Sequence, residues 1–153
     1  MIETLRIDQA IYVARRMRDA DFREVMATRW DDDHDRFAID SFQLPGVAWA
    51  ATDGEGLPVA IGGVAMHTPG VGTAWLVATD EFPRVAVSVT RHVRRVVARL
   101  LDGHLNRIHA FSAAFHTDAH RWMRRIGMRP EATLKAFGKR GEDFVMYVIT
   151  RED

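Results

Sequence analysis

The chain has 153 residues, about the size of one domain, and 47% of them are hydrophobic, which is enough to form a core. It contains no cysteine, which excludes disulfides and thiolate metal sites, and no apolar run approaches the roughly 20 residues of a membrane helix, so we expect a soluble protein. Its 21 basic and 21 acidic residues give no net charge, whereas nucleic-acid-binding domains are usually strongly basic, so we expect no nucleic-acid partner.

The first third of the chain predicts a short strand followed by helices. Asp8 is a typical helix N-cap, because its carboxylate can accept hydrogen bonds from the free amides of a first turn. Asp19 or Asp21 is placed to cap a second helix in the same way, and a third, short helix is expected to end before Pro45. The predicted elements are a strand over 3–7 and helices over 9–18, over 19–29 and within 30–46.

Strands dominate the middle of the chain. Two runs rich in Val, Ile and Ala flank the turn 53–57, which holds two glycines and is typical of a β-hairpin. Gly62 and Gly63 inside the second run indicate a bulge or the close approach of another backbone. The predicted strands are 47–52, 58–66 and 72–79.

A long amphipathic helix is predicted from about Pro83 to Leu101, because its valines recur at helical spacing. A strand over 107–115 follows it, and strand, helix and strand in this order form a parallel crossover. We therefore predict a mixed α/β domain over 1–153, with a mostly antiparallel sheet, one parallel strand pair and flanking helices. The remaining predicted elements are a helix over 117–126 ended by Gly127, and strands over 131–138 and 143–150.

Four segments carry a resemblance to known proteins: 13–29, 41–64, 74–82 and 118–128. In this order they resemble the GNAT acyltransferase superfamily, and more closely a tailed-phage family of small GNAT-like internal virion proteins. The resemblance implies a twisted sheet in which the parallel pair splays apart. In GNAT enzymes, acetyl-CoA binds at that splay.

The resemblance also implies which residues would hold acetyl-CoA. The backbone amides of Leu76, Val77 and Ala78 would hold the pantetheine arm, and the turn that begins at Arg84 would hold the pyrophosphate. Glycines in that turn let a backbone approach an anion closely. Here Val85, Ala86 and Val87 place side chains at the corresponding positions, although Arg84 could meet a phosphate. This departure argues against acetyl-CoA, and no cofactor is expected.

No catalytic residue is predicted. GNAT enzymes commonly place a proton-donating Tyr four residues before a Gly, and here Met123 stands four residues before Gly127. Methionine cannot donate a proton. Asp80, Glu81 or His116 could serve as a general base near the splay, although the two carboxylates also suit a helix N-terminus and the histidine a surface or capping position.

No metal site is predicted either. His116 and His120 have the i, i+4 spacing of a zinc helix, but Thr117 stands where that motif needs Glu. The acidic run 31–35 lacks the spaced ligands of a calcium loop and is better explained as a solvated loop.

The leading hypothesis is a phage-encoded GNAT-like protein that acts in the virion or its assembly, with acyltransferase chemistry lost. Its partners would be other virion proteins or a second copy of the chain, and it would lie in the virion or the host cytoplasm. Residues 1–76 carry 7 basic and 12 acidic residues (−5) and residues 77–153 carry 14 and 9 (+5), which suits complementary docking. The interface residues expected under this hypothesis are Arg121, Trp122, Arg124 and Arg125, because Trp and Arg are enriched at interface anchors.

The alternative is an acetyl-CoA-dependent N-acyltransferase with a nonstandard pyrophosphate turn.

Overall fold

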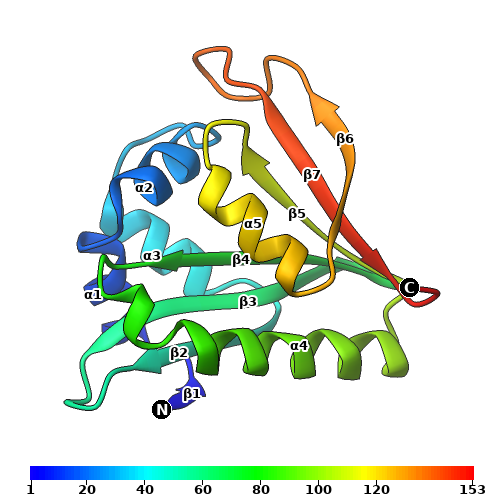
Figure 1. Cartoon of the computed structure of the whole chain (residues 1–153). Helices are drawn as coiled ribbons and strands as arrows, with labels where there is room; N and C mark the ends of the chain where they lie inside the picture. The colour runs from blue at the N-terminus through cyan, green and yellow to red at the C-terminus, as the bar shows by residue number, and fades with distance from the viewer.

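A computed structural model describes residues 1–153 as one seven-stranded mixed sheet with helices on both faces (Figure 1). The strand order is β1-β2-β3-β4-β5-β7-β6. No helix has the length and hydrophobicity needed to cross a bilayer. The strands are β1 (Ile2–Thr4), β2 (Gly46–Thr52), β3 (Pro58–Thr68), β4 (Val71–Ala78), β5 (Arg107–Ala113), β6 (Arg129–Leu134) and β7 (Phe144–Thr150). The helices are α1 (Ile7–Arg15), α2 (Asp19–Met26), α3 (His34–Phe42), the short 3-10 turn η1 (Phe82–Arg84), α4 (Ala86–Gly103) and α5 (Thr117–Arg125).

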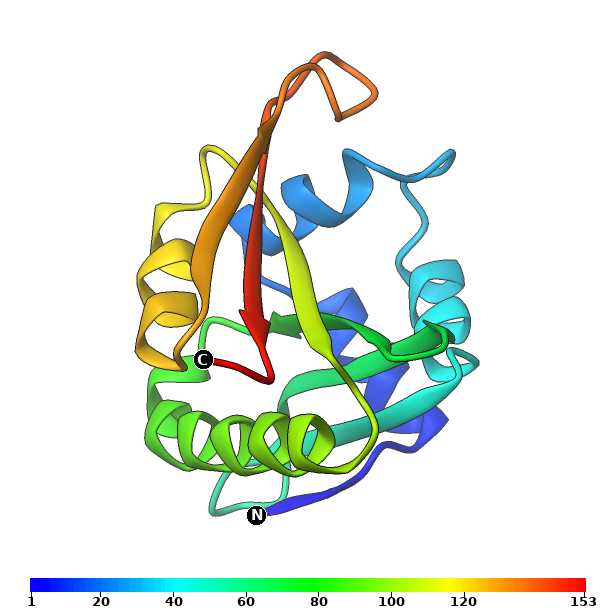
Figure 2. The same cartoon turned by 90° about the vertical axis from the view of Figure 1, so that its right-hand side faces the viewer.

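The predicted parallel pair is formed by β4 and β5, and every other neighbouring pair in the sheet is antiparallel. The two strands pair only from Val71 opposite Arg107 to Thr73 opposite His109. Beyond that point they diverge, and Figure 2 shows the resulting V, with β5, β7 and β6 on one arm. The sequence-based prediction of a parallel crossover through α4 is thus confirmed.

The two faces of the sheet have separate cores. Val77 and Trp75 of β4 pack with α1 and α3 on one face. Leu76 and Ala78, which alternate with them along the strand, pack with α4 on the other face. Helix α5 lies over β5 and β7 on the same face as α4, because its Met123 packs with residues of both strands and of α4. The crossover helix and α5 therefore border one side of the V.

Two predicted helix caps are wrong. Helix α1 begins at Ile7, before Asp8, because the Gln9 side chain accepts from the Arg6 amide at 3.0 Å, and Asp8 instead pairs with the Arg6 guanidinium. Helix α2 has no side-chain cap. Neither Asp19 nor Asp21 serves there, since Asp19 lies inside the first turn and the Asp21 carboxylate is turned into the interior. The third helix ends before Pro45 as predicted and is capped by Asp33.

The last hairpin differs from the prediction at its first strand. Gly127 adopts φ +99°, the conformation expected of a residue that ends a helix, and it turns the chain directly into β6 at Arg129. The strand therefore starts and ends earlier than predicted. Phe137, expected in a strand, lies in the loop between β6 and β7, beyond Ala136 at φ +52°.

Gly62 and Gly63 mark a close backbone approach, as the sequence indicates. A Cβ on Gly63 would lie 2.3 Å from the Val47 carbonyl oxygen of β2, and one on Gly62 would lie 2.8 Å from the side chain of Trp49. The backbone at Gly63 has little freedom to move, because β3 is paired on both sides.

We expect Gly63→Ala to lower the free energy of unfolding by about 3 kcal/mol, the upper end of ordinary overpacking costs. Urea denaturation measures it. The matched control is Gly54→Ala in the exposed β2–β3 turn, where an added Cβ meets nothing within 4 Å, so a change of no more than about 0.5 kcal/mol is expected. Equal stability of the two variants would show that β2 and β3 separate easily.

Candidate active site

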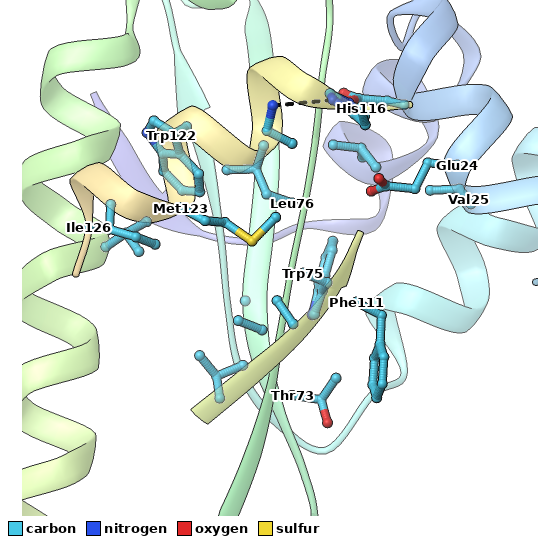
Figure 3. Close-up of a pocket in the computed structure, with 18 of the residues that line it drawn as sticks. Glu24, Val25, Thr73, Trp75, Leu76, Phe111, His116, Trp122, Met123 and Ile126 are labelled. Atoms are coloured by element: carbon cyan, nitrogen blue, oxygen red, sulfur yellow. Dashed lines mark hydrogen bonds and ion pairs between the residues drawn. The ribbon is translucent and has the colours of Figure 1, made fainter. Parts of the chain in front are cut away.

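A cleft of about 1290 Å³ occupies the V between β4 and β5. It is lined from both faces of the sheet, by β4 and β5 themselves and by helices α2, α4 and α5. Figure 3 shows Leu76 of β4 and Met123 of α5 pointing toward each other inside it, with Glu24 and Phe111 on the opposite side. The residues that line the cleft include Glu24, Leu76, Ala86, Val87, Phe111, Trp122, Met123 and Phe137.

The inner edge of β4 offers backbone groups to this cleft. The Ala78 amide donates to an Asp21 carboxylate oxygen at 2.8 Å, away from β3, whereas the next amide, of Thr79, donates to Val59 of β3 at 2.8 Å. Since amides alternate along a strand, Leu76 directs its N–H and C=O into the gap, as Ala78 does. Of the three amides expected to face a pantetheine arm, that of Leu76 is thus open to the cleft. The amide of Val77 is directed toward β3, and that of Ala78 is occupied.

The turn after β4 leads to an uncapped helix. No side chain caps α4, and its first i, i−4 bond joins the Val89 amide to the Val85 carbonyl at 2.9 Å. The amides of the first turn, at Ala86, Val87 and Ser88, therefore precede the helical ladder and remain open donors. Ala86 and Val87 line the cleft. This end of the cleft presents amides and the positive end of the helix dipole, the combination that binds anions.

The crowding expected from the missing glycines does not arise at Val85. Its side chain is buried in the core between α4 and the sheet, away from the cleft. No residue from 79 to 89 has a positive φ, so the turn needs no glycine for its backbone conformation. Val87 does border the cleft but is 65% exposed. Arg84 does not line the cleft and pairs with Glu81 at 2.7 Å.

Basic residues of α4 and α5 form a rim on the same side. Arg91, Arg121 and Arg125 line the cleft, and Arg121 also pairs with Asp118. Trp122 lies between the two helices, where its Nε1 donates to the Thr90 hydroxyl at 2.9 Å. Three of the four residues expected at a protein interface thus border the cleft, and the fourth, Arg124, lies over the ring of Tyr147 at 5.7 Å. The interface itself stays a prediction.

Glu24 is the carboxylate best placed for proton transfer. Its Oε2 accepts from the Ser112 hydroxyl and from the Ala113 amide, both at 2.8 Å, which fixes it at the end of β5. Its Oε1 has no hydrogen-bond partner and is not buried, so it is open toward the cleft that Glu24 lines. Burial raises the pKa of Glu24, against the lowering effects of the His116 charge and the two hydrogen bonds. A carboxylate of raised pKa in a cleft suits a general base.

A buried ion network stands next to Glu24. The Asp21 carboxylate accepts from the Arg18 guanidinium at 2.9 to 3.0 Å, from His116 Nε2 at 2.7 Å and from the Ala78 amide. His116 Nδ1 accepts from the Ala119 amide at 3.2 Å and so caps α5, in agreement with the capping alternative. Burial lowers the pKa of His116, but the hydrogen bond to Asp21 and the charges of Glu24 and Asp21 outweigh it and raise the pKa overall.

The other predicted site residues are dispersed. Asp80 lines the cleft near the start of α4, whereas Glu81 is engaged with Arg84. Met123 is buried with its sulfur directed into the cleft, where a Tyr hydroxyl was expected (Figure 3). His120 Nε2 bonds to the Ala113 carbonyl at 3.0 Å, while His116 faces Asp21, so the two rings serve different partners. The acidic run before α3 is engaged in capping and in ion pairs with Arg29, Arg15 and Lys139.

Sequence reasoning missed Glu24 and assigned Asp21 to a cap. The available signal is weak: Asp21, Glu24 and Val25 lie three and four residues apart and therefore share one face of α2. Carboxylates on the face that also carries buried apolar residues indicate an inward polar function. Nothing local, however, distinguishes that face from a solvated one in so short a helix.

Several solved structures share this fold. An acetyltransferase of the GNAT family from Bacillus anthracis superposes with a TM-score of 0.74 at 17% identity, covering 99% of this chain and 95% of that one. The ribosomal-protein-S18-alanine N-acetyltransferase from Escherichia coli gives 0.71 at 13% identity, covering 98% and 92%. A GNAT superfamily phosphinothricin acetyltransferase from Sinorhizobium meliloti, solved in complex with AcCoA, gives 0.72 at 10% identity, covering 98% and 87%. The chain therefore has the GNAT fold.

No family model matches the sequence, and no curated protein does. None of the comparisons supports the resemblance to a tailed-phage family, whereas the GNAT part of the resemblance is confirmed as a fold. The hypothesis of a virion protein with lost acyltransferase chemistry is wrong. The structures of this fold named above are acetyltransferases. The turn that the hypothesis took as too crowded for a pyrophosphate leads to an uncapped helix N-terminus that borders the cleft.

Proposed function

We propose that the chain is an acetyl-CoA-dependent N-acetyltransferase. The observation that carries the proposal is one continuous cleft in which the open edge of β4 at Leu76 leads to the uncapped N-terminus of α4. Leu76 would hydrogen-bond the pantetheine arm through its N–H and C=O, and the first-turn amides of α4 would hold the pyrophosphate. Arg91, Arg121 and Arg125 would neutralise further phosphate charge along the rim.

Acetyl-CoA supplies an activated acyl group, and the chain's residues bring an amine to it. Glu24 would accept a proton from the acceptor ammonium at its open Oε1. The neutral amine would then attack the thioester carbonyl carbon, the C–N bond forming as the C–S bond breaks, with CoA leaving as a thiolate that takes up the surplus proton of the nitrogen. A thiol has a pKa of about 8.5, so its thiolate leaves near neutral pH without a protein acid. Met123 is therefore compatible with this reaction, and it contributes an apolar wall.

Acetyl-CoA binding tests the cofactor half directly. We expect calorimetry to give a Kd in the micromolar range, roughly −8 kcal/mol. Val87→Asp is expected to weaken binding by about tenfold, because a carboxylate at the start of α4 repels the pyrophosphate. The same charge favours the helix dipole, so the variant is expected to keep or slightly raise its unfolding free energy.

S-acetylpantetheine is the matched control ligand for Val87→Asp. It keeps the arm that Leu76 would bind but has no pyrophosphate, so its affinity is expected to be the same for the variant and the wild type. A parallel loss for both ligands would place the effect outside the anion site. An unchanged acetyl-CoA affinity would remove α4 from the binding site altogether.

A further inference from the structure

Resting on the proposed function, we propose that the acceptor is a small arylalkylamine, whose ring stacks on Phe111 and Phe137 and whose amine lies at Glu24. Support comes from the stacked ring pair that lines the cleft, its position beside Glu24, the ion pairs around Glu24 and the tie between two loops that border the cleft.

Phe111 of β5 and Phe137 of the β6–β7 loop form an aromatic wall. Their rings are stacked with centroids 5.6 Å apart and planes at 16°, and both line the cleft. Each ring also contacts a second ring: the centroids of Phe137 and Phe144 are 5.3 Å apart, and those of Phe111 and His109 are 5.2 Å apart. Phe111 nevertheless remains 36% exposed and Phe137 45% exposed. Two large apolar rings held rigidly against an open cleft suit an aromatic ligand, which prefers offset or edge contact with such rings.

The spacing between the wall and Glu24 follows from β5. Glu24 is held by the backbone amide of Ala113, two residues beyond Phe111 and on the same side of the strand. Two residues of strand span about 6.6 Å. The aromatic pair and Glu24 are therefore neighbours along β5, and we expect a short linker between the ligand's ring and its amine.

The charge around Glu24 favours an amine without a carboxylate. Arg29, the guanidinium on the acceptor side of the cleft, is already bound to Asp31 and Asp40. Arg18 and His116 face Asp21. Glu24 thus keeps an open oxygen that can accept from an ammonium. Each cation named here is already paired with a carboxylate of the protein, so none is left to bind the carboxylate of an amino acid.

Lys139 ties together two loops that border the cleft. Lys139 of the β6–β7 loop donates through its amide to the Ala27 carbonyl at 2.7 Å. Its Nζ donates to the Arg29 carbonyl at 3.0 Å and to Asp32 at 2.8 Å. These bonds tie the loop that carries Phe137 to the α2–α3 loop, and residues of both loops line the cleft. Because the tie limits how far the two loops can separate, we expect a compact amine to be favoured over a peptide chain.

The test compares acetylation of 2-phenylethylamine, n-hexylamine and a Phe-initiated tripeptide by the full chain. We expect kcat/KM for 2-phenylethylamine to exceed that for hexylamine by about tenfold, the size of a good aromatic contact. Phe111→Leu and Phe137→Leu should each remove most of that preference, by lowering kcat/KM for 2-phenylethylamine more than kcat/KM for hexylamine. Phe42→Leu is the matched control, because Phe42 is equally exposed but lies on α3 outside the cleft.

Saturation-transfer NMR with each amine, in the absence of acetyl-CoA, separates this proposal from the proposed function. Binding of 2-phenylethylamine that depends on Phe111, without turnover, would overturn the acetyltransferase and keep the aryl site. Acetyl-CoA binding and turnover without an aryl preference, or with the tripeptide as the better substrate, would overturn the aryl site and keep the acetyltransferase. Absence of both binding and turnover would overturn both.

Discussion

Glu24→Gln is expected to lower kcat for acetyl transfer by about 10²–10⁴-fold while leaving acetyl-CoA affinity unchanged, the range usual for loss of a general base. Glutamine is close in shape and keeps an oxygen that can accept from Ser112 and the Ala113 amide, so the end of β5 should hold its position. Only the basic oxygen facing the cleft is lost. Steady-state kinetics with calorimetry on the same samples separates the chemical step from binding.

The pH profile identifies Glu24 more specifically than the rate alone. Because burial raises its pKa, the wild-type rate should climb with pH through that raised value, and this limb should vanish in the variant. A carboxyl group whose pKa is raised by folding also makes the folded protein less stable as the pH rises from the ordinary pKa of that group through the raised pKa. Glu24→Gln should therefore be at least as stable as the wild type at neutral pH. Glu55→Gln, in the exposed β2–β3 turn, is the control.

A variant with wild-type kcat and an unchanged pH profile would remove Glu24 from the reaction. Asp80 would then be the next carboxylate to test, since it also lines the cleft beside the start of α4. An unfolded variant is not expected, because no buried charge is left without a partner when Glu24 becomes neutral.

Much of the fold is predictable from local patterns. The apolar run of β4, the valine stripe of α4 and the strand after it require a parallel crossover, because a helix with one apolar face must pack back onto the sheet. The β2–β3 hairpin follows from its glycine turn in the same way. Such predictions succeed because the residues that decide them are close together in the sequence.

The site was harder to predict because distant residues decide it. Asp21 looks like a helix cap by position, yet its carboxylate binds Arg18, Ala78 and His116 from three separate segments. The turn before α4 lacks glycine, which suggests crowding, but the inward rotation of Val85 depends on the core that receives it. A family pattern gives the residue types that usually allow a conformation, and here other residues adopt it with ordinary φ values.

Asp21→Asn is expected to be the most destabilising single change in the site, costing about 3–5 kcal/mol, the usual loss when one member of a buried ion pair is removed. Asp21 is 3% exposed and both of its oxygens are used. An amide has one oxygen, so in either orientation its NH₂ group would face donors: the Arg18 guanidinium and the Ala78 amide in place of Oδ2, or Arg18 and His116 Nε2 in place of Oδ1. The matched control is Asp19→Asn on the same helix, whose side chain is 85% exposed and lies 3.9 Å from Arg23. It should change stability by no more than about 0.5 kcal/mol.

The pH dependence of unfolding shows whether the charge of Asp21 is what matters. The pKa of His116 is raised in the folded chain, chiefly by Asp21 against the opposing effect of burial. Its protonation therefore adds stability that is fully present below the ordinary histidine pKa and is lost as pH rises through the raised value. Urea denaturation across that range should show stability falling with pH in the wild type and in Asp19→Asn, and falling much less in Asp21→Asn. Protonation at Nδ1 would break the cap to the Ala119 amide, so a wild type with no such slope would show that His116 stays neutral as the cap of α5.

A loss of unfolding free energy in Asp21→Asn as small as that in Asp19→Asn would show that solvent replaces the carboxylate, and that β4 is held in place without it.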